Sequence, residues 1–419
     1  MFVYTVKPGD SLYSISQKYH IPLNSIRMVN GLYRENITPG QALLITSDTY
    51  IVQQGDSFYS IAKTAYQSQE SLIRANPSLN PNQLQPGMRI RIPEVSKEYI
   101  TTFGYTVIRG LESDVKQIED FAPYTTLMAL FEYHVFSNGS LSQLNVTAEV
   151  QAAWRNHMTP LATITNLTQQ GFSSSLVHQV LSDPAVSEKL IDNIHRLVTR
   201  DGYGGVNIDF ENVSTRDRDL FSSFLRRLGQ RLKENNLMMT IAVPAKESND
   251  IPWLKGYDYG AIGSVVDYMF IMAYDWHYPG SEPGPVAPIG NIRRTLDFTV
   301  GKIRSNKIIL GVPYYGYDWV LPYRPGNLPV TLSAQAAAVV AMNANVPIQY
   351  SEQDKSPFYY YTDQSRQRHV VWFEDSRSLI EKALLVREYK LGGIGAWQLS
   401  FGVPQGSWIL TNFFRVKKV

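Results

Sequence analysis

Eight short apolar segments, rich in β-branched residues, alternate with stretches of helical periodicity in the long C-terminal part of the chain. These segments are residues 103–108, 125–131, 160–165, 206–210, 239–243, 268–274, 308–312 and 395–397. Between them, residues such as Phe221, Phe224, Leu228 and Leu232 recur at the spacing of one helix face. Apolar strands that alternate with helices indicate a parallel sheet covered on its faces. Eight of them predict an α/β fold, the (β/α)8 or TIM barrel.

The part of the chain that holds these strands, residues 97–419, is longer than the about 250 residues of a plain barrel. The surplus lies between the seventh and eighth predicted strands, at about residues 317–372. An Ala-rich stretch at 334–344 is typical of a helix, and a Tyr-rich run follows at 358–361. We therefore predict a small α+β insertion there, which would form one wall of a groove over the barrel mouth.

The first part of the chain contains an internal repeat, because residues 6–15 closely match residues 52–61. In each copy a short strand ends at a Gly-Asp turn, two helical segments follow, and a Pro-Gly turn precedes a closing strand. The repeat predicts two small βααβ modules, residues 1–47 and 48–95. Two units are too few for a solenoid, so we expect the modules to be independent.

Both copies resemble LysM modules, which bind glycans that contain N-acetylglucosamine, such as peptidoglycan and chitin. The resemblance covers nearly the whole of both copies, and the repetition makes it specific. It implies sugar contacts in the loops after Gly9 and Gly55, and near Asn30 and Asn76.

Three polar residues stand at alternating positions of the fourth predicted strand. Because successive side chains of a strand point to opposite faces, Asn207, Asp209 and Glu211 should all point into the barrel. Burial of three polar side chains is costly unless they are hydrogen-bonded together. Neighbouring carboxylates also influence each other's pKa, so that one can stay protonated near neutral pH. A protonated carboxylic acid beside a charged one suits general-acid cleavage of a glycosidic bond.

This strand resembles the signature of glycoside hydrolase family 18, Asp-Gly-x-Asp-x-Asp-x-Glu. Asp209 and Glu211 match its last two acidic positions, whereas Gly204 and Asn207 stand where the family has its first two aspartates. Because Asp209 has fewer acidic neighbours than the family pattern, we expect it to stay ionised, and activity to persist, at mildly acidic pH.

Two distant segments support the resemblance. Met-Ala-Tyr-Asp-Trp at residues 272–276 matches the family's motif on the sixth strand. Gly-Gly-Ile-Gly-Ala-Trp at residues 392–397 fits its eighth strand, whose tryptophan lies beneath the sugar. Family membership implies a retaining, substrate-assisted reaction in which the 2-acetamido oxygen attacks the anomeric carbon and an oxazolinium intermediate forms.

The resemblance also implies a role for each matched residue. Glu211 would protonate the leaving oxygen and then activate water. Asp209 would orient the acetamide and stabilise its developing charge, and Tyr274 would hydrogen-bond the acetamide oxygen. The residues implied to bind substrate are Asn207, Asp275 and Trp397. The reaction requires no metal and no organic cofactor.

Composition excludes several classes of protein. The chain has 39 Lys and Arg against 37 Asp and Glu, which is far from the dense basic surface that nucleic-acid binding needs. It has no cysteine, which excludes disulfides, cysteine-ligated metals and a thiol nucleophile. No apolar run approaches the about 20 residues of a membrane span, and the N-terminus lacks the pattern of a signal peptide. We expect a monomer whose partner is a glycan.

Two LysM modules joined to a family 18 barrel resemble the spore-associated peptidoglycan hydrolases of endospore-forming bacteria. This resemblance implies an N-acetylglucosaminidase that degrades cortex fragments during germination. It also implies synthesis in the mother cell without a signal peptide, and a place in the outer layers of the spore, coat or cortex. Two alternatives stay open: a chitinase or chito-oligosaccharide hydrolase, and a catalytically inactive glycan-binding protein similar to a lectin.

Overall fold

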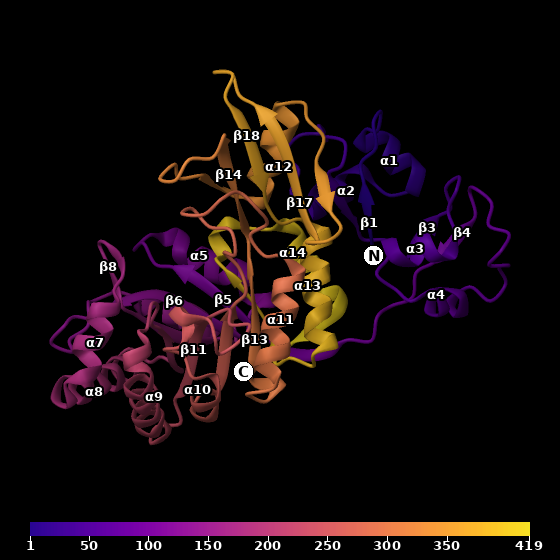
Figure 1. Cartoon of the computed structure of the whole chain (residues 1–419). Coiled ribbons are helices and arrows are strands. Elements are labelled where there is room, and N and C mark those ends of the chain that lie inside the picture. Colours follow the sequence, from indigo (N-terminus) through magenta and orange to yellow (C-terminus); the bar gives the residue numbers. More distant parts are fainter.

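A computed structural model describes residues 1–419, and a closed parallel sheet forms its largest part (Figure 1). Its strands are β5 (Glu98–Val107), β6 (Leu127–His134), β7 (Thr159–Thr165), β10 (Gly205–Asp209), β11 (Met238–Pro244), β12 (Tyr268–Met272), β13 (Ile308–Pro313) and β19 (Gly393–Trp397). Each strand pairs with the next in parallel, and β19 pairs with β5, which closes the barrel. The short strand β20 (Phe414–Val416) pairs in parallel with the first residues of β5. The predicted TIM barrel is therefore confirmed.

Helices cover the outside of the barrel, because each has one apolar face that must be buried. They are α5 (Glu112–Phe121), α6 (Thr147–Arg155), α7 (Ser174–Ser182), α8 (Pro184–Arg200), α9 (Arg218–Lys233), α10 (Tyr259–Val265), α11 (Ile289–Val300), α13 (Ser376–Glu388) and α14 (Pro404–Phe413). Helix α9 buries Phe221, Phe224, Leu228 and Leu232, as its periodicity predicts. None of the helices combines the length and the apolar composition that crossing a membrane would require.

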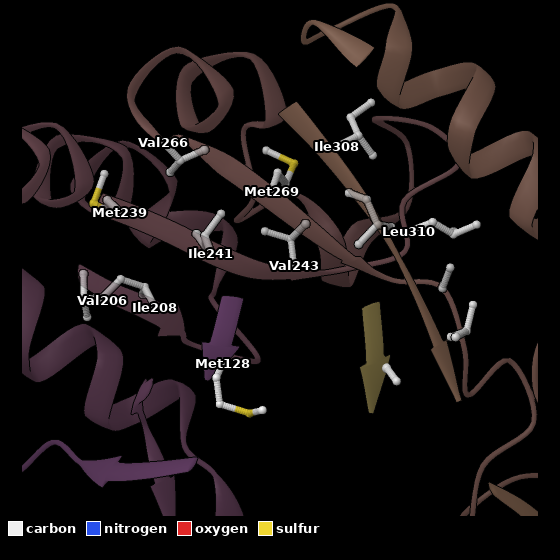
Figure 2. Packing of buried hydrophobic residues seen from close by; sticks show 14 of the residues in the cluster. Met128, Val206, Ile208, Met239, Ile241, Val243, Val266, Met269, Ile308 and Leu310 are labelled. Atoms are coloured by element: carbon white, nitrogen blue, oxygen red, sulfur yellow. The ribbon is translucent and has the colours of Figure 1, made fainter. Parts of the chain in front are cut away.

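Side chains of the barrel strands alternate between two layers, because the period of a strand is two residues. On β10, Val206 and Ile208 face the surrounding helices and pack in the large apolar cluster that also holds Ile241 (Figure 2). Asn207 and Asp209, the residues that alternate with them, face the barrel interior. The alternation of apolar and polar residues on β10 thus aims its polar side chains at the barrel axis.

Aromatic rings fill the barrel interior. The ring of Phe270 lies 5.3 Å from that of Phe103 and 5.1 Å from that of Tyr105, measured between centroids. A Cβ atom at Gly311 would approach the Phe270 ring to 2.5 Å, and one at Gly395 to 2.6 Å. The two glycines therefore leave the space that this ring occupies, and the packed rings form the floor of the barrel mouth.

A small α+β insertion lies between β13 and β19, as predicted. Its elements are β14 (Tyr315–Leu321), β15 (Val330–Ser333), α12 (Ala334–Asn343), β16 (Gln349–Ser351), β17 (Ser356–Thr362) and β18 (Arg368–Trp372). The strands form an antiparallel sheet in the order β15-β14-β18-β17-β16. The insertion starts at Tyr315, slightly before the predicted residue, because β14 leaves the barrel almost directly after Pro313.

The N-terminal repeat folds into two βααβ units, which we call module 1 and module 2. Module 1 holds β1 (Phe2–Thr5), α1 (Leu12–Tyr19), α2 (Leu23–Val29) and β2 (Ala42–Ile45); module 2 holds β3 (Thr49–Ile51), α3 (Phe58–Thr64), α4 (Gln69–Ala75) and β4 (Arg89–Arg91). In both, a serine caps the first helix and a second serine completes the capping box: Ser11 with Ser14, and Ser57 with Ser60.

The asparagine that ends the second helix of each module is a structural residue. The Asn30 amide donates to the carbonyls of Ile26 and Leu44, and its oxygen accepts from the Leu44 N–H at 2.7 Å. Asn76 makes the equivalent three bonds in module 2. Since these bonds tie the second helix to the closing strand, sugar contacts near this position would have to come from neighbouring residues.

The two modules do not stand apart, and the expectation of independent units is wrong. The ring of Phe2 lies 5.0 Å from that of Tyr50, and the ring of Tyr19 lies 5.4 Å from it, so one apolar cluster runs through both modules. Val3 and Leu44 of module 1 belong instead to the core of the barrel domain. Shared apolar burial therefore joins both modules to the rest of the chain.

Candidate active site

The carboxyl ends of the barrel strands open into a cavity of about 740 Å³. Five of the six predicted site residues line it: Asp209, Glu211, Tyr274, Asp275 and Trp397. They come from β10, from the segment after β12 and from β19, so the barrel brings together residues far apart in sequence. This position is where (β/α)8 barrels carry their active sites.

Glu211 stands just beyond the end of β10, where its backbone is held on both sides by one residue. Its N–H donates to Oδ1 of Asn166 at 2.8 Å, and its carbonyl accepts from Nδ2 of Asn166 at 2.8 Å. Asn166 itself is buried and directly follows β7. This clamp between neighbouring strands fixes where the Glu211 carboxyl enters the cavity.

Burial and crowding of acidic groups change the charge of the site. Burial, and then the charge of Asp275, raises the pKa of Glu211 to about 7. The pKa of Asp209 is raised well above its usual range by burial, then by the charges of Glu211 and Glu132. An oxygen of Asp209 and one of Glu132 are buried without a hydrogen-bond partner. The Asp209–Glu211 pair therefore favours holding a proton near neutral pH.

This finding contradicts the expectation that Asp209 stays ionised easily at mildly acidic pH. The strand signature has lost an acid at position 207, but Glu132 on β6 contributes its charge from another part of the chain. The Glu132 pKa is itself raised by burial. Glu132 ends a run of apolar residues, and nothing in its sequence surroundings indicates a position beside Asp209.

Asp275 is held by the insertion rather than by the barrel. The hydroxyls of Tyr315 and Tyr317, on β14, donate to its Oδ1 at 2.8 and 3.0 Å. Burial raises the pKa of Asp275 to about 6, while these two hydrogen bonds act to lower it. Because both tyrosines bind the same oxygen, the carboxyl has one fixed orientation beside Glu211.

Two family models match this chain. The one for glycosyl hydrolases family 18 matches residues 169–402, and the one for the LysM domain matches residues 4–46 and 50–93. The chain belongs to glycosyl hydrolase family 18. It is thus a glycoside hydrolase that also carries two LysM domains.

Family 18 relatives resemble the whole chain. The putative sporulation-specific glycosylase YdhD of Bacillus subtilis is 52% identical over 100% of both chains. The cortical fragment-lytic enzyme of Bacillus anthracis is 33% identical over 99% of both. The crystal structure of the Bacillus cereus spore cortex-lytic enzyme SleL matches with a TM-score of 0.90, at 31% identity over 99% of both chains. The similarity to these proteins therefore extends over the modules, the barrel and the insertion.

Asn207 lies in the signature strand of this family 18 chain, but it does not line the cavity. It is completely buried, donates from Nδ2 to the Tyr105 hydroxyl at 3.0 Å and accepts from the Thr240 hydroxyl at 2.9 Å. The sequence predicted that Asn207 contacts the substrate directly. Its complete burial contradicts that prediction. Asn207 instead positions Tyr105, whose ring borders the cavity.

Aromatic side chains surround the family 18 cavity. The Trp397 ring packs edge to face against Phe131 and Tyr105, with centroids 4.8 and 5.3 Å apart, and so is held as a flat wall. Trp253 and Tyr278, which are largely exposed, stand farther out in the lining. These two residues were not predicted from the sequence, because the only signal for them is the high aromatic content of the chain. Aromatic faces suit the apolar faces of sugar rings.

Proposed function

We propose that this chain hydrolyses N-acetylglucosaminyl bonds of spore-cortex peptidoglycan. The observation that carries the proposal is Glu211, a carboxyl with a raised pKa that lines an aromatic-walled cavity beside Asp209. Relatives named as a sporulation-specific glycosylase and as cortical fragment-lytic enzymes support the cortex as substrate. They also support a place of action in the outer layers of the spore.

The proposed mechanism uses the substrate's own 2-acetamido group as nucleophile. Asp209 and Glu211 are two residues apart at the end of β10, so Asp209 is poorly placed to attack the opposite face of the sugar. Glu211 donates its proton to the leaving oxygen as the acetamide oxygen closes on the anomeric carbon. It then takes a proton from the water that opens the oxazolinium ring. The sugar keeps its configuration through the two displacements.

The other residues of the cavity serve this reaction by position. When the proton of the pair is on Glu211, Asp209 is ionised, accepts a hydrogen bond from the acetamide N–H and stabilises the positive charge that develops on the ring. Tyr274 donates a hydrogen bond to the acetamide oxygen, and Trp397 stacks beneath the sugar. Asp275 faces Glu211, and its charge keeps the proton on Glu211 until it is transferred.

The stereochemistry of the first product tests this mechanism. The first-formed reducing sugar should be the β-anomer, because attack by the acetamide and then by water inverts the anomeric carbon twice. Proton NMR before mutarotation measures the anomer, and a substrate without the acetamido group should not be turned over. Initial release of the α-anomer would exclude the acetamide as nucleophile. Products from cortex peptidoglycan compared with those from chitin oligomers separate the cortex enzyme from a chitinase.

The pH profile follows from the pKa of Glu211. The group must be protonated to act as an acid, so kcat/KM should fall about tenfold per pH unit above about 7. Replacement Asp275→Asn removes a negative charge that raises this pKa, so the alkaline limb should move to lower pH in kinetics on a soluble substrate. A limb that stays in place, or moves to higher pH, would contradict the assignment of Glu211 as the acid.

A further inference from the structure

The closing strands of the two modules differ in which faces they bury. In β2, the residues Ala42 to Ile45 are all buried: Leu43 and Ile45 face the core of the modules, while Ala42 and Leu44 face the core of the barrel domain. In β4 only Ile90 is buried, between the exposed Arg89 and Arg91. Module 1 is therefore covered on both sides of its sheet, whereas the corresponding strand of module 2 has one side in solvent.

The Pro-Gly turn of module 1 is attached to the catalytic domain. The Pro39 carbonyl accepts from the Ile348 N–H at 2.8 Å, and the Thr38 hydroxyl donates to the Val346 carbonyl at 2.9 Å. Arg377 donates to the Gly40 carbonyl at 3.2 Å. A Cβ atom at Gly40 would lie 1.8 Å from the Ile348 oxygen, so the two backbones are in direct contact.

The same turn is open in module 2. Gly87 matches Gly40 and has nearly the same φ, +89° against +81°, but a Cβ atom there would meet nothing within 4 Å. Gln85, Pro86 and Gly87 are exposed, and no hydrogen bond joins them to the catalytic domain. Module 2 meets the barrel core through Tyr66, in the turn between α3 and α4. In Figure 1, β4 and α4 lie at the outer edge of the molecule.

The open turn lies beside a second exposed element of module 2. The Gly87 N–H donates to the Val52 carbonyl at 2.9 Å, which places the turn next to the Gly-Asp loop that leads into α3. Tyr59, in the first turn of α3, is 67% exposed, and Tyr13 at the matching place in α1 is 65% exposed. An exposed ring beside an open turn suits the apolar face of a sugar ring.

We propose that module 1 attaches the N-terminal region rigidly to the catalytic domain, and that module 2 alone binds the glycan. The captured ligand is a strand that contains N-acetylglucosamine, so the inference rests on the proposed function. Module 1 uses the backbone of its second loop to bind the insertion and α13, and that backbone is not free for a sugar. Module 2 keeps the same loop free, at a position that module 1 sets relative to the cavity.

Methionine methyl NMR on the full chain with Glu211→Gln tests the proposal, with a tetramer of N-acetylglucosamine as the probe. Met88 belongs to the open turn, where its sulfur accepts from the Gln85 N–H. Met28 stands at the end of α2 in module 1 and is 73% exposed. Met272 lines the catalytic cavity. We expect saturable shifts at Met88 and Met272, and none at Met28.

Equal shifts at Met28 and Met88 would overturn the division between the modules, and so would a shift at Met28 alone. A shift at Met272 without one at Met88 would also overturn it, while leaving the proposed function in place. Failure of the proposed function is read separately, as absence of cleavage of cortex fragments by the unsubstituted chain.

A matched pair of substitutions adds a binding measurement. Tyr59→Ala should lower the affinity for insoluble peptidoglycan by about tenfold. The fraction of the protein that pellets with the peptidoglycan measures this affinity. Tyr13→Ala makes the same change at the corresponding exposed site of module 1, and should alter affinity by less than about twofold. Equal losses, or a larger loss with Tyr13→Ala, would overturn the proposal.

Discussion

Replacement Glu211→Gln should lower the rate of glycan cleavage by about 10²–10⁴-fold while binding of the same glycan persists. The amide keeps the size of the side chain and its place in the cavity, and the Asn166 clamp acts on the backbone, which the substitution does not alter. What is lost is the proton that the leaving oxygen needs. The measurement is product release from cortex fragments, with binding followed by co-sedimentation.

A matched control is the same change at an exposed glutamate. Glu188 on α8 pairs with Arg227 at the surface and does not line the cavity, so the Glu188→Gln variant should cleave at the rate of the unsubstituted chain. An unsubstituted chain that binds fragments but cleaves nothing, like Glu211→Gln, would exclude the enzymatic function. The lectin-like alternative would then remain.

The second large effect concerns stability. Lys382→Met should lower the free energy of unfolding by about 3–5 kcal/mol, because it removes one partner of a fully buried ion pair. Lys382 on α13 donates to Glu374 at 2.8 Å, and both side chains have 0% exposure. Urea denaturation measures this loss as a lower midpoint concentration of urea, with an unchanged dependence of the unfolding free energy on urea concentration.

A double variant separates the pair from the packing around it. Glu374→Leu with Lys382→Met replaces both charges by apolar groups, and should recover most of the stability lost in the single variant. In the single variant, burial raises the pKa of Glu374 without an opposing cation, so the loss should shrink toward acidic pH and grow as pH rises. Equal stability of Lys382→Met and the unsubstituted chain would contradict a structural role for the pair.

Much of the catalytic fold could be predicted because its signals are local. Each barrel strand is a short apolar run, and each helix has its own periodicity, so element type follows from neighbours in the sequence. The alternation of Val206, Asn207, Ile208 and Asp209 also predicted which side chains face the barrel interior. The expectation of independent modules overlooked a local signal. Ala42 to Ile45 is continuously apolar, whereas Arg89-Ile90-Arg91 alternates, a difference that is typical of a strand covered on both sides in module 1 only.

Periodicity and spacing along the chain directly encode the eight strands, the two modules and the acidic pair at the end of β10. The surroundings of that pair, by contrast, depend on how distant segments pack together. Glu132 and Asn166 reach it from separate elements, and Tyr315 reaches the neighbouring Asp275. No spacing in the chain records which strand ends meet. The same packing buries Asn207 too deeply for it to touch a substrate. Burial, and the charge and hydrogen bonds that depend on it, arise from contacts between distant segments, which local periodicity does not encode.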